Sequence, residues 1–355
     1  MIGKLLDRYI AKIILSAIGL VTLLLAGLQL FILFVSQVDA IGKANFDVFE
    51  AGLFVFLQMP YQVYLFFPMA SLLGSLIGLG IMANHHELVV IRAAGMSIWQ
   101  VSFAVIKAAV VVIMLVTIIG ETLVPKLSHF ANNKKLQAMS KGHILRTTNG
   151  TWLRFQNNFI NVGTILADDS LHQINQFQFD NEHHLRFTRH IDRAQFIDNH
   201  WHAYQVVESQ LADKITTCHR DQMIWDIPLT VGLLSAGRSE PDEMTLSELS
   251  DFLGAEKYFN RNKFNYQLAF WQRITQPITT LVMMILAIPF IFGPLRSSTM
   301  GYKLLIGATV GFGFNILNRF FGPISQVMQW PVEIAAFAPT SLCIILGIYL
   351  MRRAK

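Results

Sequence analysis

The segment Gly232-Leu-Leu-Ser-Ala-Gly-Arg-Ser239 differs by one residue from a nucleotide-binding P-loop, because Arg238 stands where that loop requires lysine. A P-loop lies between a strand and a helix whose N-terminus holds phosphate. Here Pro241 follows closely, and the sequence offers no evident partner for Mg²⁺. We therefore interpret the match as coincidence and do not expect this chain to hydrolyse ATP.

Histidines are the next candidates for chemistry, since nine of the eleven lie between residues 121 and 265. His200 and His202 would share one face of a strand, where a metal site is conceivable. No HExxH motif or Cys–His cluster accompanies them, so solvated strand histidines are the favoured interpretation. The chain also lacks a GxSxG motif, and its apolar segments contain no acid apart from Glu333 at a boundary. These features argue against an intramembrane enzyme, and the sequence predicts no cofactor or metal.

The composition is that of a membrane protein with a sizeable polar part. Hydrophobic residues make up 53% and charged residues only 14%, with a mean hydropathy of +0.44, whereas soluble chains carry about 25% charged residues. Residues 121–265 hold 17 of the 23 acids and 15 of the 28 bases. The basic excess therefore lies beside the apolar segments, which argues against nucleic-acid binding. Cys218 and Cys343 lie in different parts of this pattern and predict no disulfide.

Six segments are long and apolar enough to cross a membrane, which takes roughly 20 residues. The first is too long for a signal peptide and lacks a cleavage site, so it is predicted to be retained. Pro60 is predicted to separate a short interfacial helix from the second span. The expected domains are 1–120 with three spans, the polar block 121–265, and 266–355 with three more. The six predicted spans are 13–37, 61–83, 98–120, 268–292, 304–324 and 331–350.

The distribution of lysine and arginine predicts the orientation. With the N-terminus inside, the inner segments 1–12, 84–97, 293–303 and 351–355 carry nine bases against two acids. The short outer loops carry one lysine, Lys43, against four acids. Both termini are therefore expected in the cytoplasm and residues 121–265 on the opposite side of the membrane.

The polar block reads as β-rich, with polar breaks at the spacing of a sandwich or roll. Thr245-Leu-Ser-Glu248 then matches a capping box that opens a helix leading towards the fourth span. The expected strands are Thr151–Phe155, Phe159–Leu166, Ile174–Phe179, Leu185–Ile191 and Trp201–Val207.

The inner loop at about 84–95 predicts a short helix parallel to the membrane. Asn84 can cap it, Glu87 suits its first turn, and Gly95 offers a C-terminal stop. Leu88 and Ile91 would share one face, flanked by Glu87 and Arg92. Such a helix fits a groove on a cytoplasmic partner, and an ordinary interfacial helix is the alternative.

Polar residues inside the spans are costly and usually face a cavity or a partner. Arg273 in span four and Arg319 in span five could contact anionic groups of an amphipathic ligand, and snorkelling to headgroups is the equal alternative. Phenylalanines near them could contact acyl chains or simply pack. The other polar and aromatic side chains of the spans that could line such a cavity are Gln272, Gln276, Asn315, Asn318, Lys107, Phe66, Phe67, Phe320 and Phe321.

Several segments occur together and in order, and with three spans, an outer β domain and three more spans they resemble the YjgP/YjgQ (LptF/LptG) permease family along essentially the whole chain. No single motif is decisive, and the specificity lies in their order. They are Leu6-Asp7-Arg8-Tyr9, Phe66-Phe67-Pro68-Met69-Ala70, Glu87-Leu88-Val89-Val90, Phe292-Gly293-Pro294-Leu295-Arg296-Ser297 and Phe321-Gly322-Pro323.

The resemblance implies a six-span (3+3) α-helical membrane protein with an inserted periplasmic β-jellyroll-like domain, in the inner membrane of a Gram-negative bacterium. It implies a non-catalytic permease subunit that extracts lipopolysaccharide from the outer leaflet of that membrane and passes it to an LptA-like periplasmic bridge. Implied partners are an LptF-like permease in a heterodimer, two LptB-like ATPases and an LptC-like membrane protein. The inner-loop helix becomes a coupling helix that docks on the ATPase through Glu87, Leu88, Val90, Ile91 and Arg92.

One departure concerns the outer end of span one, where close relatives can carry several lysines thought to meet lipid phosphates. Leu33–Ala40 contains no lysine here, and only Lys43 follows. Lys43, Arg273 or Arg319 could contact the phosphates instead, or the partner subunit could supply most of these contacts. The candidates for the lipopolysaccharide cavity are Lys43, Phe67, Arg273, Asn315, Arg319 and Phe320. The alternatives to this function are the sister permease of the same complex and a non-transporting scaffold with a periplasmic β domain.

Overall fold

A computed structural model describes most of the chain, which divides into two compact units. The first unit comprises Met1–Asp39, Gly52–Ser128 and Gln267–Lys355, and the second comprises Ala40–Ala51 and His129–Tyr266. The P-loop-like segment 232–239 and His183 lie outside the described residues. The described residues are 2–43, 45–95, 97–139, 151–155, 157–165, 170–180, 182, 184–197, 200–211, 215–227, 241–254, 263–292 and 298–353.

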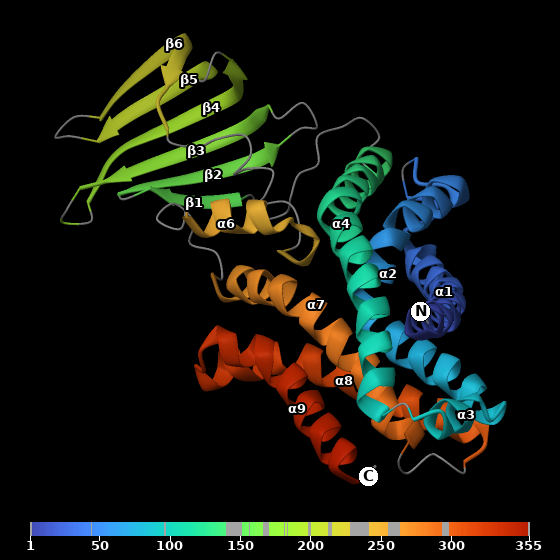
Figure 1. The fold of residues 1–355 in the computed structure, drawn as a ribbon. Coiled ribbons are helices and arrows are strands. Elements are labelled where there is room, and N and C mark those ends of the chain that lie inside the picture. The colour runs from blue at the N-terminus through green and yellow to red at the C-terminus, as the bar shows by residue number, and fades with distance from the viewer. Residues whose placement is uncertain are drawn as a thin grey trace. The chain divides into compact units, whose positions relative to one another are not determined.

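Six long helices have the length and composition needed to cross a membrane, which confirms the predicted 3+3 arrangement (Figure 1). Three precede the β-strands and three follow them. A seventh, short helix, α3, lies between the second and third. The helices are α1 (Ile2–Gln37), α2 (Val48–Asn84), α3 (Glu87–Ala93), α4 (Ile98–Met139), α7 (Lys263–Phe292), α8 (Met300–Met328) and α9 (Val332–Arg353).

The core of the first unit is built around α2 and α7. In the most apolar 18-residue stretch of each helix, 78% of α2 and 61% of α7 is buried, against 11% of α1 and 17% of α8. Fully buried side chains such as Leu76 on α2 and Ala287 on α7 form one cluster with residues of α1, α3 and α4. The corresponding stretches of α4 and α9 are each 28% buried, so α1, α4, α8 and α9 all present exposed apolar faces, most extensively α1 and α8.

The prediction that Pro60 divides the second span is wrong. Helix α2 runs without a break from Val48 to Asn84 through both Pro60 and Pro68. Proline is tolerated inside apolar helices where other groups satisfy the carbonyl that loses its hydrogen bond. The segment from Val48 to Met59 is therefore continuous with the rest of α2.

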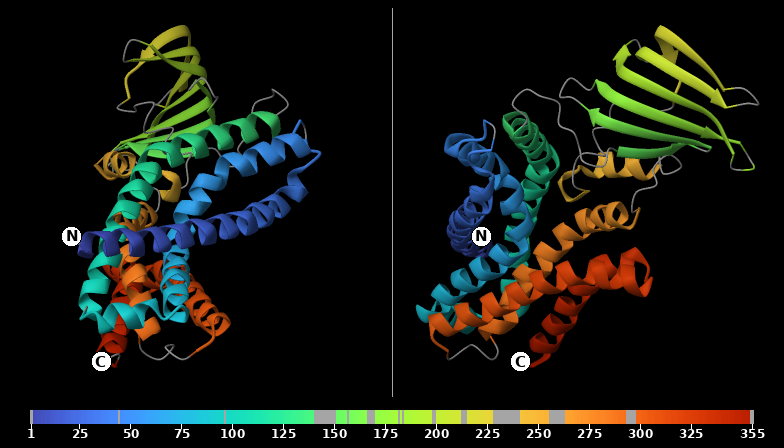
Figure 2. Two further views of the ribbon diagram at one scale, coloured as in Figure 1. Left: turned by 45° about the vertical axis from the view of Figure 1, so that its right-hand side comes forward. Right: turned by 180° about the vertical axis from the view of Figure 1, so that it is seen from behind.

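Helix α1 packs directly against the backbone of α2 at two glycines. A Cβ atom placed on Gly74 would lie 2.5 Å from the Ile18 Cα, and one on Gly78 would lie 3.1 Å from the Ile14 Cα. Small residues let helix backbones approach closely, which is the main source of helix association in lipid. The two glycines therefore fix the N-terminal half of α1 to α2, and the α1 helix can be followed along its length in Figure 2.

The second unit contains a six-stranded antiparallel sheet in which each strand pairs with its neighbour in the chain (Figure 1). This order is that of an up-and-down β-meander, and the described strands form a single sheet. Strand β6 was missed in the sequence because its side chains are polar and exposed along most of its length. The strands are β1 (Thr151–Phe155), β2 (Asn158–Ile165), β3 (Leu171–Phe179), β4 (Leu185–Ile197), β5 (His200–Leu211) and β6 (Ile215–Trp225).

A line of irregular residues crosses the sheet and reverses its side-chain alternation. Gln173 on β3 and Gln205 on β5 have left-handed φ values of 52° and 51°. Strand β4 lies between β3 and β5, and its Asp192 is at the same level of the sheet. Neither Gln173 nor Gln205 forms a regular pair with Asp192. Buried residues on the two sides of this line are therefore three positions apart, as are Leu171 and Ile174 on β3. One apolar face thus continues across the kink.

The predicted capping box is confirmed at the start of α6 (Leu246–Gly254). The Thr245 N–H donates to Glu248 Oε2 at 2.8 Å, and the Glu248 N–H donates to Thr245 Oγ1 at 3.1 Å. Two N–H groups that the first turn leaves without helical partners are satisfied reciprocally.

Candidate functional site

Helix α3 lies where a short inner-loop helix was predicted, but its start differs. Asn84 is the last residue of α2, so it does not cap α3. His86 occupies the cap position in a left-handed conformation, with φ of 61°, and makes no side-chain cap hydrogen bond. The helix ends as expected, since Gly95 has φ of 89° and its N–H donates to the Arg92 carbonyl at 3.0 Å. The N-terminus of α3, where Glu87 is the first residue, must therefore be stabilised by contacts with other helices.

The apolar face of α3 points inward, which corrects the expected docking role of Leu88 and Ile91. Their side chains are only 4% and 7% exposed and belong to the main core of the helical unit. Val89 and Val90 are 53% and 67% exposed instead, and Arg92 is exposed. The surface available to a partner therefore includes Val89, Val90 and Arg92, together with the partly exposed Glu87.

Glu87 is bonded to α1. The Tyr9 hydroxyl lies 3.0 Å from Glu87 Oε1 and 3.1 Å from Oε2. Two residues earlier on α1, Asp7 forms an ion pair with Lys107 of α4 at 2.5 Å. The start of α1 is thus joined to both helices that follow α2.

Arg273 is buried, and the structure does not support its predicted contact with an anionic ligand. Its side chain is 4% exposed and its Nη1 donates to the Gly120 carbonyl at 3.2 Å, with Glu121 Oε1 at 3.4 Å. The guanidinium also lies over the Tyr64 ring, 5.1 Å from its centroid. A buried cation needs such partners in an apolar body. Arg273 therefore ties α7 to α4 and α2.

Gln276, one turn further along α7, compensates for a proline in α2. Pro68 has no N–H, so the Tyr64 carbonyl four residues earlier loses its usual helical donor. The Gln276 Nε2 donates to this carbonyl at 2.8 Å. Gln276 is therefore explained by the Pro68 of the Phe66–Ala70 motif rather than by a ligand.

The remaining cavity candidates differ in exposure. Phe67 is 5% exposed and lies in the main core, which corrects its expected contact with acyl chains. Asn315 is half-buried, while Arg319 and Phe320 are exposed on α8, with Phe320 at 61%. Lys43 is exposed in the turn that follows the 3₁₀ helix Val38–Ala40. This lysine belongs to the second unit.

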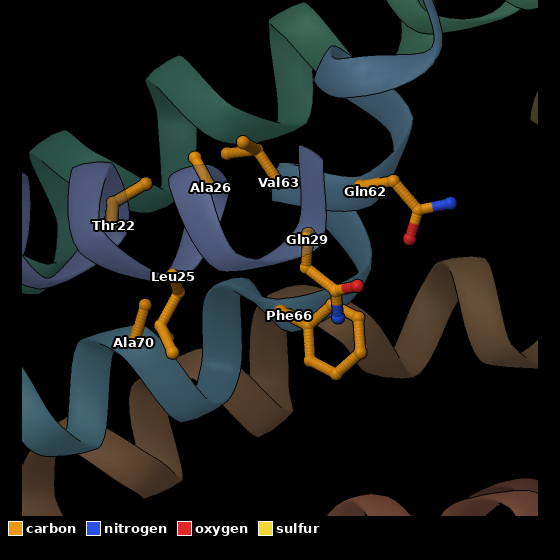
Figure 3. A pocket seen from close by; sticks show the side chains of 8 residues that line it. All are labelled: Thr22, Leu25, Ala26, Gln29, Gln62, Val63, Phe66 and Ala70. Carbon is orange, nitrogen blue, oxygen red and sulfur yellow. The ribbon is translucent and has the colours of Figure 1, made fainter. Parts of the chain in front are cut away.

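A small pocket lies between α1 and α2 (Figure 3). Its volume of about 10 Å³ is close to that needed by one water molecule. In Figure 3 the Gln29 amide lies beside the Phe66 ring, while the Gln62 amide points away from it. The pocket is too small for a lipid chain and its two amides do not converge. Its lining residues are Thr22, Leu25, Ala26, Gln29, Gln62, Val63, Phe66 and Ala70.

The buried face of the sheet combines an apolar cluster with one polar network. Ile160, Ile174, Ile191 and Trp201 are among its fully buried residues. Figure 1 shows the strands β2 to β5 that carry them as neighbours in the sheet. The buried face of the sheet is therefore apolar across four neighbouring strands.

Arg189 and Glu208 form the charged part of the network. The Arg189 Nε and Nη2 donate to Glu208 Oε2 at 2.9 and 2.5 Å. The Arg189 Nη1 and the Trp225 Nε1 both donate to Gln176 Oε1, at 3.1 and 3.0 Å. Burial raises the pKa of Glu208, but the hydrogen bonds and charge of Arg189 outweigh it and hold the pKa below its usual value.

The histidines of the sheet do not assemble a metal site in the described part of the chain. No group of three or more His, Cys, Asp or Glu side chains there could hold an ion. His202 Nδ1 lies 3.4 Å from Gln222 Nε2, and His190 Nδ1 lies 2.8 Å from Asn175 Oδ1. These are ordinary cross-strand contacts.

Six long apolar helices, interrupted after the third by a β domain, define a membrane protein that crosses the bilayer several times. The chain belongs to the LptF/LptG family of lipopolysaccharide export system permeases, whose pattern matches residues 8–353. It is 36% identical over 352 residues to the lipopolysaccharide export system permease protein LptG of Escherichia coli K12, covering 98% of each chain. It is 35% identical over 353 residues to the LptG of Haemophilus influenzae, covering 99% of each.

The Gln276–Tyr64 contact predicts a double-mutant rescue. Gln276→Leu leaves the Tyr64 carbonyl without a donor and should lower the free energy of unfolding by about 1 kcal/mol, equivalent to about 2 °C in Tm. Pro68→Ala supplies the missing N–H, so it should restore most of the loss in the Gln276→Leu background. Thermal unfolding of the full-length protein in detergent measures both variants. Equal destabilisation with and without Pro68→Ala would contradict the pairing.

The Arg189–Glu208 pair predicts the acid sensitivity of the sheet. Because the folded pKa of Glu208 is depressed, its stabilisation is complete above the unfolded pKa of about 4.5 and is lost as pH falls through the folded pKa. Arg189→Met should lower the free energy of unfolding at pH 7 by about 1 kcal/mol, because the half-buried Glu208 loses both bonds from Arg189 and keeps the longer one from Gln210 Nε2 at 3.3 Å. In that variant, lowering the pH should restore stability as Glu208 protonates.

Denaturant unfolding of the full-length protein, followed by tryptophan fluorescence at several pH values, measures this pH-dependent stability of the sheet. Trp201 and Trp225 serve as the probes because both are buried in the sheet. Arg193→Met is the matched control, because Arg193 lies exposed on the same strand and its Nη2 donates to Gln195 Oε1 at 3.4 Å. A pH profile of Arg189→Met identical to that of Arg193→Met would refute the assigned role of Glu208.

Proposed function

We propose that this chain is an LptG-type permease subunit of an ATP-driven transporter that extracts lipopolysaccharide from the inner membrane. The match to the LptF/LptG family over nearly the whole chain, with curated relatives that are named LptG, carries the proposal. The chain acts without catalysis of its own, and a separate cytoplasmic subunit hydrolyses ATP. Both termini are cytoplasmic and the β domain is periplasmic, as the lysine and arginine distribution predicts.

The proposed complex contains an LptF-like permease, two LptB-like ATPases and an LptC-like membrane protein, and it delivers the lipid to an LptA-like bridge. The exposure of α1 and α8 supports a partner within the membrane. These helices present large apolar side chains such as Leu23 and Phe31 on α1 and Phe320 on α8, which are 70%, 65% and 61% exposed. A heterodimer would place such faces around a shared lipid cavity.

Helix α3 is the proposed coupling helix. It offers the ATPase an exposed apolar pair, Val89 and Val90, beside Arg92 and the carboxylate of Glu87. Leu88 and Ile91 on its inner face transmit movement to the core, because their neighbours are packed residues of the long helices. ATP-driven closure of the ATPase pair would thus displace the spans around the lipid.

The proposed lipid contacts are Phe320, Arg319 and Asn315 on α8, together with Lys43. Phe67 and Arg273 take the supporting role that their burial indicates. Transfer of acyl chains through water would cost about 0.8 kcal/mol for each CH₂ group, so the path needs continuous apolar surface. The apolar face of the sheet is proposed to shelter acyl chains in the β domain.

Glu87→Gln tests the coupling role. Loss of the carboxylate charge should weaken association with the ATPase by about tenfold, and ATP-dependent release of lipopolysaccharide from proteoliposomes should fall in parallel. Co-purification and lipid release are measured on the same preparations. Glu333→Gln is the matched control, since Glu333 is the exposed first-turn acid of α9 as Glu87 is of α3.

Normal association and release by the Glu87→Gln protein would overturn the coupling role. A wild-type complex that binds the ATPase and lipid but releases none would instead support a scaffold.

A further inference from the structure

The motif Leu6-Asp7-Arg8-Tyr9 at the start of α1 contains a residue that bonds Glu87 of α3. The Tyr9 hydroxyl is 3.0 and 3.1 Å from the two carboxylate oxygens, although the residues are 78 positions apart in the chain. Tyr9 is 45% exposed, so its ring contributes only part of its surface to packing. The hydroxyl contact is thus the most specific feature of this side chain.

Helix α3 depends on contacts from outside because its own sequence gives it little stability. It has seven residues, of which Val89, Val90 and Ile91 are β-branched, and isolated helices of this length do not persist. His86 provides no side-chain cap. Leu88 and Ile91 anchor its inner face, and the Tyr9 hydroxyl holds its first residue.

The geometry leaves Glu87 able to bind a partner while Tyr9 holds it. A carboxylate has about four lone-pair sites, and the Tyr9 hydroxyl donates one proton. A cation on an ATPase subunit can therefore approach Glu87 without displacing Tyr9. The orientation of the carboxylate towards that cation is then set by α1.

Helix α1 is itself part of a rigid group at this end. Gly74 and Gly78 bring the α2 backbone against Ile18 and Ile14, while Asp7 pairs with Lys107 of α4. A displacement of α3 thus reaches α1 through Tyr9 as well as through the apolar core. Further along α1, Val21 and Leu25 still pack against α2 residues such as Met69, whereas most other large apolar side chains of the C-terminal half are exposed.

We propose that the Tyr9 hydroxyl is a positioning group that orients the Glu87 carboxylate and passes movement of α3 directly to α1. The inference rests on the proposed coupling function of α3. In this proposal the motif Leu6–Tyr9 transmits the ATP-driven movement of the ATPase subunits to α1. The motif does not contact lipid. Tyr9→Phe removes the bond and keeps the charge of Glu87, whereas Glu87→Gln keeps an acceptor for Tyr9 and removes the charge.

The experiment uses the full complex with its ATPase and partner permease, and two readouts. Backbone amide hydrogen exchange of residues 86–95 measures how strongly α3 is stabilised. The amount of lipid released per ATP hydrolysed measures how efficiently movement of α3 is transmitted to the spans. Tyr302→Phe on α8 is the control, because Tyr302 is 50% exposed and its hydroxyl makes no hydrogen bond within the described part of the chain.

Tyr9→Phe should speed exchange in α3 by about 5- to 10-fold and halve the lipid released per ATP, with ATPase association unchanged within about twofold. Glu87→Gln should show the opposite pattern, with near-normal exchange and weakened association. Tyr302→Phe should match wild type in every readout.

Unchanged α3 exchange in Tyr9→Phe would overturn the positioning role. Faster exchange with normal lipid release per ATP would overturn the transmission role. A wild-type complex that releases no lipid would overturn both the proposed function and the transmission role of Tyr9. In that case the hydrogen exchange of α3 would still decide whether Tyr9 positions Glu87.

Discussion

The contact between α1 and α2 at Gly74 and Gly78 is the constraint on which the helical unit depends. A side chain at Gly74 would meet the Ile18 backbone, so this position admits only glycine at the observed distance. In lipid, such close packing takes the place of the hydrophobic effect between helices. It secures one half of α1 while the other half stays exposed. The same helix is therefore both an anchored element beside α3 and a surface for lipid or a partner.

Polar residues in the apolar body serve this packing first. Arg273 joins α7 to α4 and α2, and Gln276 supplies the donor that Pro68 removes from α2. Because a bilayer offers no water to satisfy such groups, each must find its partner within the protein. The helices around α7 thus form a stiff body. We propose that lipid contact is left to the exposed residues of α8, of which Arg319 and Phe320 are examples.

The sequence was sufficient for features governed by local chemistry, and insufficient for those governed by packing. Six spans followed from apolar length, and the Thr245–Glu248 box followed from residue spacing. The continuous α2 helix did not follow, because the group that offsets Pro68 lies on α7, more than 200 residues away. For the same reason Phe67 and Phe320 looked alike, although one is 5% and the other 61% exposed. Which face of a helix turns inward depends on neighbours that the sequence does not identify.

In the proposed mechanism, the transported lipid passes along the exposed face of α8 while the α2 core stays closed to it. Photocrosslinking in cells tests this path, with a probe at Phe320 and a matched probe at the buried Phe67, followed by detection of lipopolysaccharide adducts. We predict an adduct at Phe320 that depends on an active ATPase and none at Phe67. An adduct at Phe67 alone, or none at Phe320 in a complex that still exports, would contradict this mechanism.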